Sequence, residues 1–145
     1  MINFTFLKKI TVSPRKRYKD WVSEIINTKG YKIGNIHYIF VDDDYLLDLN
    51  QKYLNHDWYT DIITFDYSEG DTLSGDIFIS VDRVTENAKE YKVKKEEELL
   101  RVMAHGILHL CGLNDESEEE KLEMKKNEDR AIERFINFKK ITKRK

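Results

Sequence analysis

The sequence contains few residues that cross-link or interrupt a chain. Its 145 residues include one cysteine, one proline and six glycines. A single cysteine excludes an intramolecular disulfide and is typical of a reducing cytoplasm, so we expect no disulfide-linked partner. No apolar run approaches the roughly 20 residues that span a bilayer, and the first ten residues lack the features of a signal peptide. We therefore expect a cytoplasmic protein that does not bind a membrane.

The composition also lacks a strong excess of charge of either sign. Lysine and arginine number 25 and aspartate and glutamate 27, which gives a formal net charge of −2. This balance does not indicate a nucleic-acid-binding protein, although it leaves room for local basic patches. Apolar residues make up 40% of the chain and charged residues 36%. Length and composition fit one domain, residues 1–145, with a substantial core.

Hydrophobic periodicity and turn residues predict nine elements in the order β α β α β β α α α. Strands are expected at 2–6, 34–41, 60–67 and 75–81, and helices at 13–30, 42–54, 82–92, 94–112 and 118–138. Ser13 can cap the first helix, Pro14 suits its first position and Gly30 its end, and Asp82 is expected to cap the third helix. The order predicts an α+β domain, with helices packed on one mixed four-stranded sheet.

The segment 94–112 combines an apolar helix with two histidines. His105 and His109 are four residues apart and therefore share a helix face. Gly112 can end the helix and reverse the chain, which would bring Asp115 back toward the imidazoles. This spacing is that of the zincin helix in metzincin peptidases. Two imidazoles and one carboxylate would leave an open position on a tetrahedral zinc ion.

Each of these residues also has an ordinary structural interpretation. The histidines can be buried side chains with hydrogen-bond partners, and Asp115 can cap the following helix. Cys111 could be a thiolate ligand, but a free cysteine is usually a small buried apolar side chain. Gly106 stands where zinc peptidases have the glutamate that acts as general base. That difference argues against peptide hydrolysis and favours phosphoryl chemistry, in which an RNA 2′-hydroxyl can serve as the nucleophile.

Three blocks of the sequence match one set of motifs in order and spacing. "HGILHLCGLND" at 105–115 resembles H-G-x-L-H-L-x-G-[YH]-D-H, and "LNQKYLNHDWYTDIITFDY" at 49–67 resembles L-N-x-x-Y-R-x-x-D-x-P-T-D-V-L-S-F. "GDIFIS" at 75–80 is similar to G-D-I-x-I-[CS]. These are motifs of the YbeY family, bacterial metal-dependent endoribonucleases of ribosomal RNA maturation and ribosome quality control. The family's small α+β fold would cover nearly the whole chain.

The resemblance implies one zinc ion held by His105, His109 and Asp115. Beyond the metal-bound water, the resemblance does not identify a catalytic residue in this chain. The family usually has a third histidine where this chain has Asp115. A carboxylate is a competent zinc ligand, but its negative charge lowers the electrophilicity of the ion. The resemblance therefore implies a metal site in this chain with a weaker Lewis acid than a three-histidine site.

A second departure from the family concerns phosphate binding. Where the family usually has an arginine, this chain has Leu54, which cannot hold a phosphate as a guanidinium does. Lys52 or His56 could take its place, although Lys52 can equally be an ordinary exposed side chain. Trp58 and Tyr59 could stack on unpaired bases or pack over the sheet edge. The candidate residues of the substrate cleft are His56, Trp58, Tyr59 and Asp61.

We therefore predict a single-strand-specific, zinc-dependent endoribonuclease that acts in ribosomal RNA processing and ribosome quality control. Its expected partners are single-stranded RNA and the ribosomal RNA of the small subunit. A first alternative is a ribosome-associated factor that binds RNA or protein and has a structural metal, which Leu54 and Asp115 leave open. A second alternative is a metal-dependent hydrolase of another substrate, against which Gly106 argues.

Overall fold

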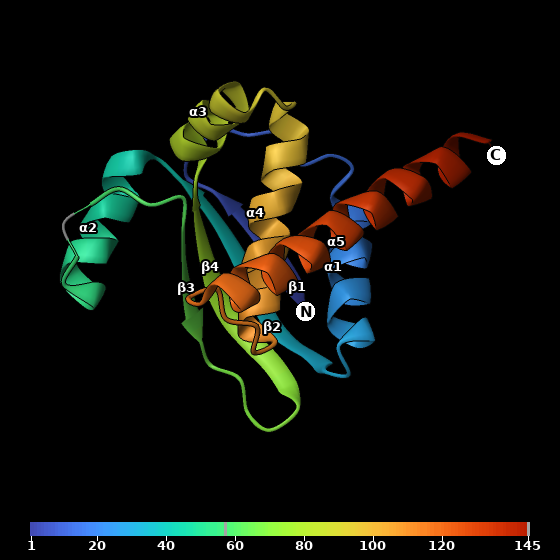
Figure 1. The fold of residues 1–145 in the computed structure, drawn as a ribbon, viewed down its shortest axis with the longest axis horizontal. Coiled ribbons are helices and arrows are strands. Elements are labelled where there is room, and N and C mark those ends of the chain that lie inside the picture. The colour runs from blue at the N-terminus through green and yellow to red at the C-terminus, as the bar shows by residue number, and fades with distance from the viewer. Residues whose placement is uncertain (57, 145) are drawn as a thin grey trace.

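The structure is a computed structural model that describes residues 1–56 and 58–144, with side chains described as far as Asn137. Within these residues four strands and five helices follow each other in the predicted order (Figure 1). The elements are β1 (Ile2–Phe6), α1 (Arg15–Thr28), β2 (Lys32–Val41), α2 (Asp43–Leu54), β3 (Ile62–Asp66), β4 (Thr72–Ser80), α3 (Val81–Tyr91), α4 (Lys95–Leu110) and α5 (Glu118–Arg144).

The strands form one mixed sheet in the order β1-β2-β4-β3. β1, β2 and β4 are parallel, with Phe4 opposite Tyr38 and Tyr38 opposite Ile77. β3 is antiparallel to β4 and forms one edge of the sheet. The α+β prediction of a mixed four-stranded sheet with five helices is therefore confirmed.

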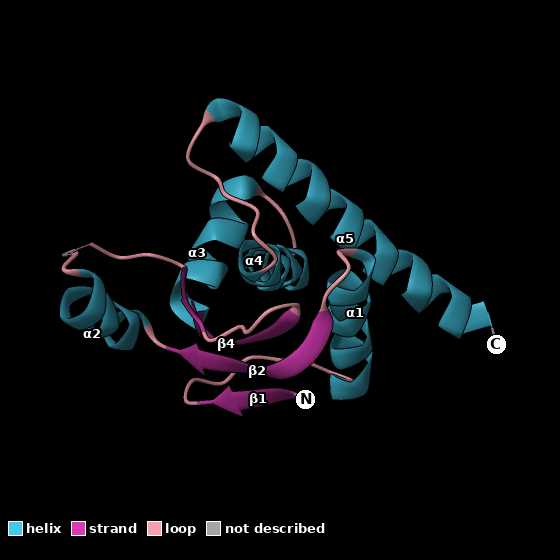
Figure 2. Cartoon of the chain, turned by 90° about the horizontal axis from the view of Figure 1, so that it is seen from below, coloured by secondary structure: helices cyan, strands magenta, loops and turns pink. Residues whose placement is uncertain are grey.

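The helix α4 is the centre of the domain. It packs against β3 and β4 on one side and against α5 on the other, so it lies between the sheet and α5 (Figure 2). Leu100, Met103 and Leu108 of α4 are buried. No helix within the described ranges combines the length and apolar composition needed to cross a bilayer.

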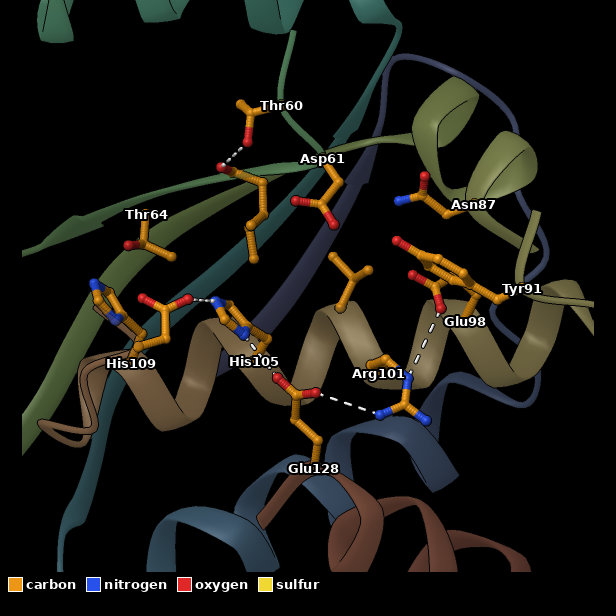
Figure 3. A pocket seen from close by; sticks show the side chains of 13 residues that line it. Thr60, Asp61, Thr64, Asn87, Tyr91, Glu98, Arg101, His105, His109 and Glu128 are labelled. Carbon is orange, nitrogen blue, oxygen red and sulfur yellow. Dashed lines mark hydrogen bonds and ion pairs between the residues drawn. The ribbon is translucent and has the colours of Figure 1, made fainter. Parts of the chain in front are cut away.

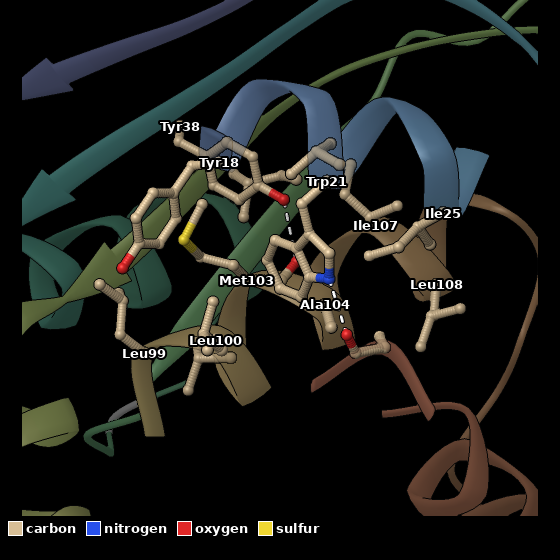
Figure 4. Close-up of a cluster of buried hydrophobic side chains, with 14 of the residues drawn as sticks. Tyr18, Trp21, Ile25, Tyr38, Leu99, Leu100, Met103, Ala104, Ile107 and Leu108 are labelled. Carbon is tan, nitrogen blue, oxygen red and sulfur yellow. Dashed lines mark hydrogen bonds between the residues drawn. The ribbon is translucent and has the colours of Figure 1, made fainter. Parts of the chain in front are cut away.

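Two buried aromatic side chains donate hydrogen bonds to backbone carbonyl oxygens of α4 and α5. The hydroxyl of Tyr38 on β2 donates to the carbonyl oxygen of Met103 at 2.9 Å. The indole nitrogen of Trp21 on α1 donates to the carbonyl oxygen of Ala131 on α5 at 2.7 Å (Figure 4). A buried aromatic ring with a satisfied polar atom stabilises both packing and orientation. These bonds set the position of the helix that presents the two histidines.

The opposite face of the sheet has a smaller apolar cluster. Ile39 and Val41 of β2 point away from the main core because successive strand residues face opposite sides. They pack with Ile63 of β3 and Leu46 of α2. The helix α2 therefore covers the sheet face that α4 does not, near the edge formed by β3.

The start of α3 differs from the prediction. Asp82 was expected to cap this helix, but the cap is Ser80, whose Oγ accepts from the backbone nitrogen of Arg83 at 3.2 Å. Asp82 is the second residue of α3. Its carboxylate accepts from Lys8 Nζ and from the backbone nitrogen of Asp43, both at 2.9 Å. The prediction for Asp82 was wrong because its carboxylate is engaged by two distant segments.

The ends of α1 and α4 can also be compared with the residues predicted to begin or end these helices. α1 begins at Arg15 with Pro14 as its N-cap and no side-chain cap, so Ser13 does not cap it. Gly30 adopts a φ of 84° just after α1, and Gly112 adopts a φ of 99° just after α4. Both glycines therefore end helices in the left-handed conformation, as the sequence predicts.

Candidate functional site

The two histidines of α4 lie on one face and line a pocket of about 490 Å³ (Figure 3). Their rings are nearly parallel, with centroids 6.3 Å apart and an angle of 7° between the planes. This arrangement follows from the four-residue spacing on a regular helix. The rest of the pocket wall comes from β3, α3, the segment before α5, and α5 itself. Helix spacing alone therefore brings His105 and His109 into one cavity.

Gly106 lies on the other side of α4, against the sheet. A Cβ atom added at Gly106 would lie 2.9 Å from Ile62 Cδ1 and 2.9 Å from Ile77 Cγ2. Such distances are far shorter than normal carbon contacts, so the glycine allows the helix to approach the sheet closely. A side chain at this position would point at β3 and β4 and not into the pocket. The general base of a zinc peptidase is therefore missing, and the geometry leaves no space for it.

Asp115 reaches the histidines through the turn after α4. The Leu113 backbone nitrogen bonds the Leu108 carbonyl at 3.1 Å, which closes the turn around Gly112. The chain then returns along the helix, and Asp115 Oδ2 lies 3.4 Å from His105 Nε2. The structure thus brings Asp115 beside His105, the position that the sequence spacing predicts.

Both imidazoles are oriented by a hydrogen bond at Nδ1. His105 Nδ1 lies 2.7 Å from Glu128 Oε2, and His109 Nδ1 lies 3.1 Å from the carbonyl oxygen of Leu113. Acceptors at both Nδ1 atoms place the protons there and leave the Nε2 atoms as lone-pair donors. Metal-binding histidines are typically held in this way by a carboxylate or a backbone carbonyl. Glu128 was not identified from the sequence, because it lies on α5, far along the chain.

The donor set matches the chemistry of zinc. Among residues 1–56 and 58–144 no three histidine, cysteine or acidic side chains are already gathered as a metal cluster. Two imidazoles with available Nε2 atoms and one carboxylate are nevertheless the ligand types of a catalytic zinc site. Cys111 does not join them, because it is buried and burial raises the pKa of its thiol to about 11. The structural interpretation of Cys111 as a small buried side chain fits this position.

The pocket changes the protonation of two of its side chains. Burial alone would lower the pKa of His105, but the hydrogen bond and charge of Glu128, with Asp115 and Asp61, raise it. Burial raises the pKa of Asp61, and the neighbouring His105 opposes this effect. A metal ion must displace a proton from a histidine with a raised pKa, so metal binding to this site weakens as the pH falls.

A chain of charged groups runs from His105 along α4. Arg101 Nη1 lies 3.3 Å from Glu128 Oε1 and 3.1 Å from Asp129 Oδ1. Arg101 Nε lies 3.8 Å from Oε1 of Glu98, a buried carboxyl oxygen with no hydrogen-bond partner among the described residues. Burial raises the pKa of Glu98 to about 7, although Arg101 opposes the shift. The histidines therefore lie at one end of an internal ionic network.

Of the four predicted cleft residues, one belongs to the described lining of the pocket and three do not. Asp61 lines the pocket. His56 and Trp58 stack on each other, with centroids 4.1 Å apart, and Trp58 is 57% exposed. Neither they nor Tyr59, whose hydroxyl lies 3.4 Å from Asp44 Oδ1, belong to the described pocket lining. Their role in substrate binding stays a prediction.

The side chains around the missing family arginine do not lie in the pocket either. Leu54 ends α2 and is 44% exposed. Lys52 forms an exposed ion pair with Asp48 at 3.1 Å. The described lining of the pocket includes neither Leu54 nor Lys52. The structure therefore supports the interpretation of Lys52 as an ordinary exposed side chain.

Fold and site together define a small α+β domain in which a helix with two histidines and a turn carboxylate open into one pocket. A family model described as endoribonuclease YbeY matches residues 4–136. The match covers most of the chain, and the chain belongs to the YbeY family. The resemblance seen in the three sequence motifs is thereby confirmed.

Individual relatives agree with this assignment. A protein of Flavobacterium psychrophilum named endoribonuclease YbeY is 49% identical over 93% of this chain and 96% of its own length. A protein of Christiangramia forsetii with the same name is 44% identical over 92% and 94%. The solution structure of TM1509 from Thermotoga maritima matches with a TM-score of 0.68 and 29% identity, over 98% of this chain and 93% of its own.

Proposed function

We propose that this protein is a metal-dependent endoribonuclease that cleaves single-stranded RNA in the cytoplasm during ribosomal RNA maturation. The observation that carries the proposal is the orientation of His105 and His109, whose Nδ1 atoms are both held by acceptors within the protein, with Asp115 Oδ2 3.4 Å from Nε2 of His105. The two relatives described above are named endoribonucleases, and this chain covers almost their whole length.

His105, His109 and Asp115 would hold the zinc ion. When bound, zinc supplies a positive charge that stabilises the negative charge developing on a phosphodiester. Glu128 and the Leu113 carbonyl keep the imidazoles in the orientation that binding needs. The protein's own contribution is therefore to fix the ligands before the metal and the RNA arrive.

Asp61 is the pocket carboxyl that we assign to proton exchange with the substrate. It lies at the start of β3 and lines the pocket together with the histidines. Because burial raises its pKa, its carboxyl group holds a proton closer to neutral pH than an exposed aspartate does. A pKa nearer the working pH is the property of a general acid or base.

The expected substrate is an unpaired strand. The reacting phosphate must enter a pocket whose walls come from three helices and a strand. A flexible single strand can turn its backbone into such a pocket, whereas a rigid A-form duplex presents its phosphates on a wide cylinder. We therefore expect the target to be a loop, an end or an unpaired region of a ribosomal RNA.

Cleavage of one labelled oligonucleotide, single-stranded or annealed to its complement at equal salt, tests the proposal. Zinc-loaded protein should cut the single strand and leave the duplex intact. The His109→Ala variant, prepared in the same way, controls for contaminating ribonucleases and should be inactive. Equal cleavage by the parent protein and His109→Ala, or no cleavage by the parent, would contradict the proposal.

The first alternative is distinguished by the same experiment. A factor with a structural metal would bind the oligonucleotide but leave it uncut. For the second alternative, a metal-dependent hydrolase of another substrate, the case of a peptide lacks support, because Gly106 faces the sheet where a zinc peptidase has its general base.

A further inference from the structure

The pocket that contains the histidines continues into a second hollow of about 400 Å³ over the start of α5. The two hollows share Tyr91, Glu98, Arg101, His105, Asp115 and Glu128 in their walls. The second hollow adds Val93, Lys121, Met124 and Lys125, which together with Tyr91 we call the α5 arm. The cavity is thus one groove that passes His105 and extends beyond the site of the proposed reaction.

We propose that the α5 arm binds the phosphodiester backbone of a single strand next to the phosphate that reacts at the histidines. This inference rests on the proposed function, since it assigns a path to the same substrate. The ligand class is a single-stranded nucleic acid at least several nucleotides long. The binding groups are the ammonium groups of Lys121 and Lys125 and the ring of Tyr91.

The two lysines are the cations that such a strand meets. Lys121 and Lys125 are four residues apart, so they lie one above the other on α5, about one 5.4 Å helix turn apart. Lys125 pairs with Asp129 at 3.7 Å through largely exposed side chains, a contact that contributes little stability. Lys121 forms no ion pair with any described residue. The ammonium group of Lys121 and the weakly paired ammonium group of Lys125 can therefore contact successive phosphates.

The acidic side chains that line the second hollow contact basic groups inside the protein. Glu128 contacts His105 and Arg101, and Asp115 contacts His105. Glu98 is buried beside Arg101. Their charges are thus opposed by internal cations, whereas the lysine charges face the solvent. An RNA strand bound in the α5 arm therefore meets the positive charges of the two lysines on α5.

Tyr91 contributes an aromatic ring to the same groove from α3. It is the last residue of α3, it is 58% exposed, and it lines both hollows. Figure 3 shows it at the end of the pocket away from His109. Exposed aromatic rings beside a basic groove bind single strands by stacking on bases of any sequence. The α5 arm therefore pairs a stacking ring on α3 with phosphate contacts on α5.

Binding of a fluorescein-labelled, unstructured 12-nucleotide 2′-O-methyl RNA, which resists cleavage through its 2′-oxygen, tests the inference by anisotropy. The Lys121→Gln/Lys125→Gln double variant should bind about 25-fold more weakly at 0.1 M salt. Its salt-dependence slope should fall by about 1.4, since each phosphate contact contributes about 0.7 on a single strand. Tyr91→Ala should weaken binding about tenfold, and Tyr91→Phe should restore it.

Lys126→Gln is the matched control, because Lys126 is exposed on the same helix but does not line the groove. It should keep the parent's affinity and salt slope. Parental affinity in the double variant, or an equal loss in Lys126→Gln, would overturn the inference. Absence of binding by the parent protein would overturn it as well.

Cleavage of a trinucleotide and of a 12-nucleotide RNA separates this inference from the proposed function. The double variant should cut the trinucleotide at the parent's rate and the 12-nucleotide RNA more slowly at subsaturating concentration. If the parent binds RNA through the lysines but cuts neither substrate, the proposed function fails and the binding path stands. If the double variant cuts both RNAs at parental rates, the path fails and the function stands.

Discussion

Glu128 Oε2 lies 2.7 Å from Nδ1 of His105, although 23 residues separate them in the sequence. The contact joins α5 to α4 and fixes which imidazole nitrogen faces the pocket. Glu128 is itself held by Arg101 through its other oxygen. The geometry therefore gives Glu128 a role in positioning the imidazole of His105, which we propose to be a metal ligand.

Replacement of Glu128 tests this role through the metal. Glu128→Gln removes the charge that holds the His105 proton at Nδ1, so the affinity for zinc should fall about 10- to 100-fold. Competition with a chromophoric chelator measures the affinity without reference to cleavage. Asp129→Asn is the control, since Asp129 also contacts Arg101 but is not bonded to His105. Equal zinc affinities in Glu128→Gln and the parent would exclude the role.

Asp115 should be the third protein ligand. Asp115→Ala leaves two imidazoles, which hold zinc weakly, so it should lose zinc during dialysis against a mild chelator. Asp115→His should retain zinc, because imidazole is an equally suitable ligand. Metal analysis after dialysis measures both, with Glu116→Ala as an exposed neighbouring control. If Asp115→Ala keeps as much zinc as the parent, Asp115 is a turn residue and not a ligand.

The packing of α4 can be tested at Leu108. This side chain is 1% exposed in the main core, so Leu108→Ala should lower the free energy of unfolding by about 2–5 kcal/mol through the cavity it leaves. Leu122→Ala, at a position that is 61% exposed on α5, should change it by less than about 0.5 kcal/mol. Urea denaturation measures both values. A loss near zero for Leu108→Ala would mean that the helix packs with another face.

Glu98 should make stability depend on pH. Its pKa is raised from 4.5 to about 7 in the folded protein, so folding favours the protonated carboxyl group. Its stabilising contribution is complete below about pH 4.5 and is lost as the pH rises to about 7. Glu98→Gln stays neutral, so it should match the parent at pH 4 and exceed it by up to about 3 kcal/mol at pH 8. Denaturation of metal-free protein at both pH values checks this, and a constant difference would contradict it.

The sequence predicts the element order and the histidine face because both depend on local periodicity. The sites of Gly30 and Gly112 are predictable for the same reason, since a left-handed residue ends a helix. Residue spacing alone also brings Asp115 to within 3.4 Å of His105. Local rules were sufficient for these features, although they did not identify the caps of α1 and α3.

Contacts between distant segments were not predictable in this way. In the sequence Glu128 is one of many acidic residues of a charged helix. Only the packing of α5 on α4 shows that it contacts His105. Gly106 looked like a missing general base, and its closeness to Ile62 and Ile77 depends on the packing of α4 on the sheet. Asp82 looked like a helix cap, but it is bonded to residues from two other segments. Each of these contacts depends on tertiary structure, which patterns in a single sequence do not reveal.

The central claim is that the two histidines and Asp115 hold a metal ion that RNA cleavage requires. The most direct measurement follows cleavage of an unstructured oligonucleotide while zinc is removed by a chelator and then restored, with zinc content determined at each step. Activity should disappear as zinc falls to zero and return at one zinc per chain, and His105→Ala should recover neither zinc nor activity. Cleavage that persists in zinc-free protein, or that returns in His105→Ala, would contradict it.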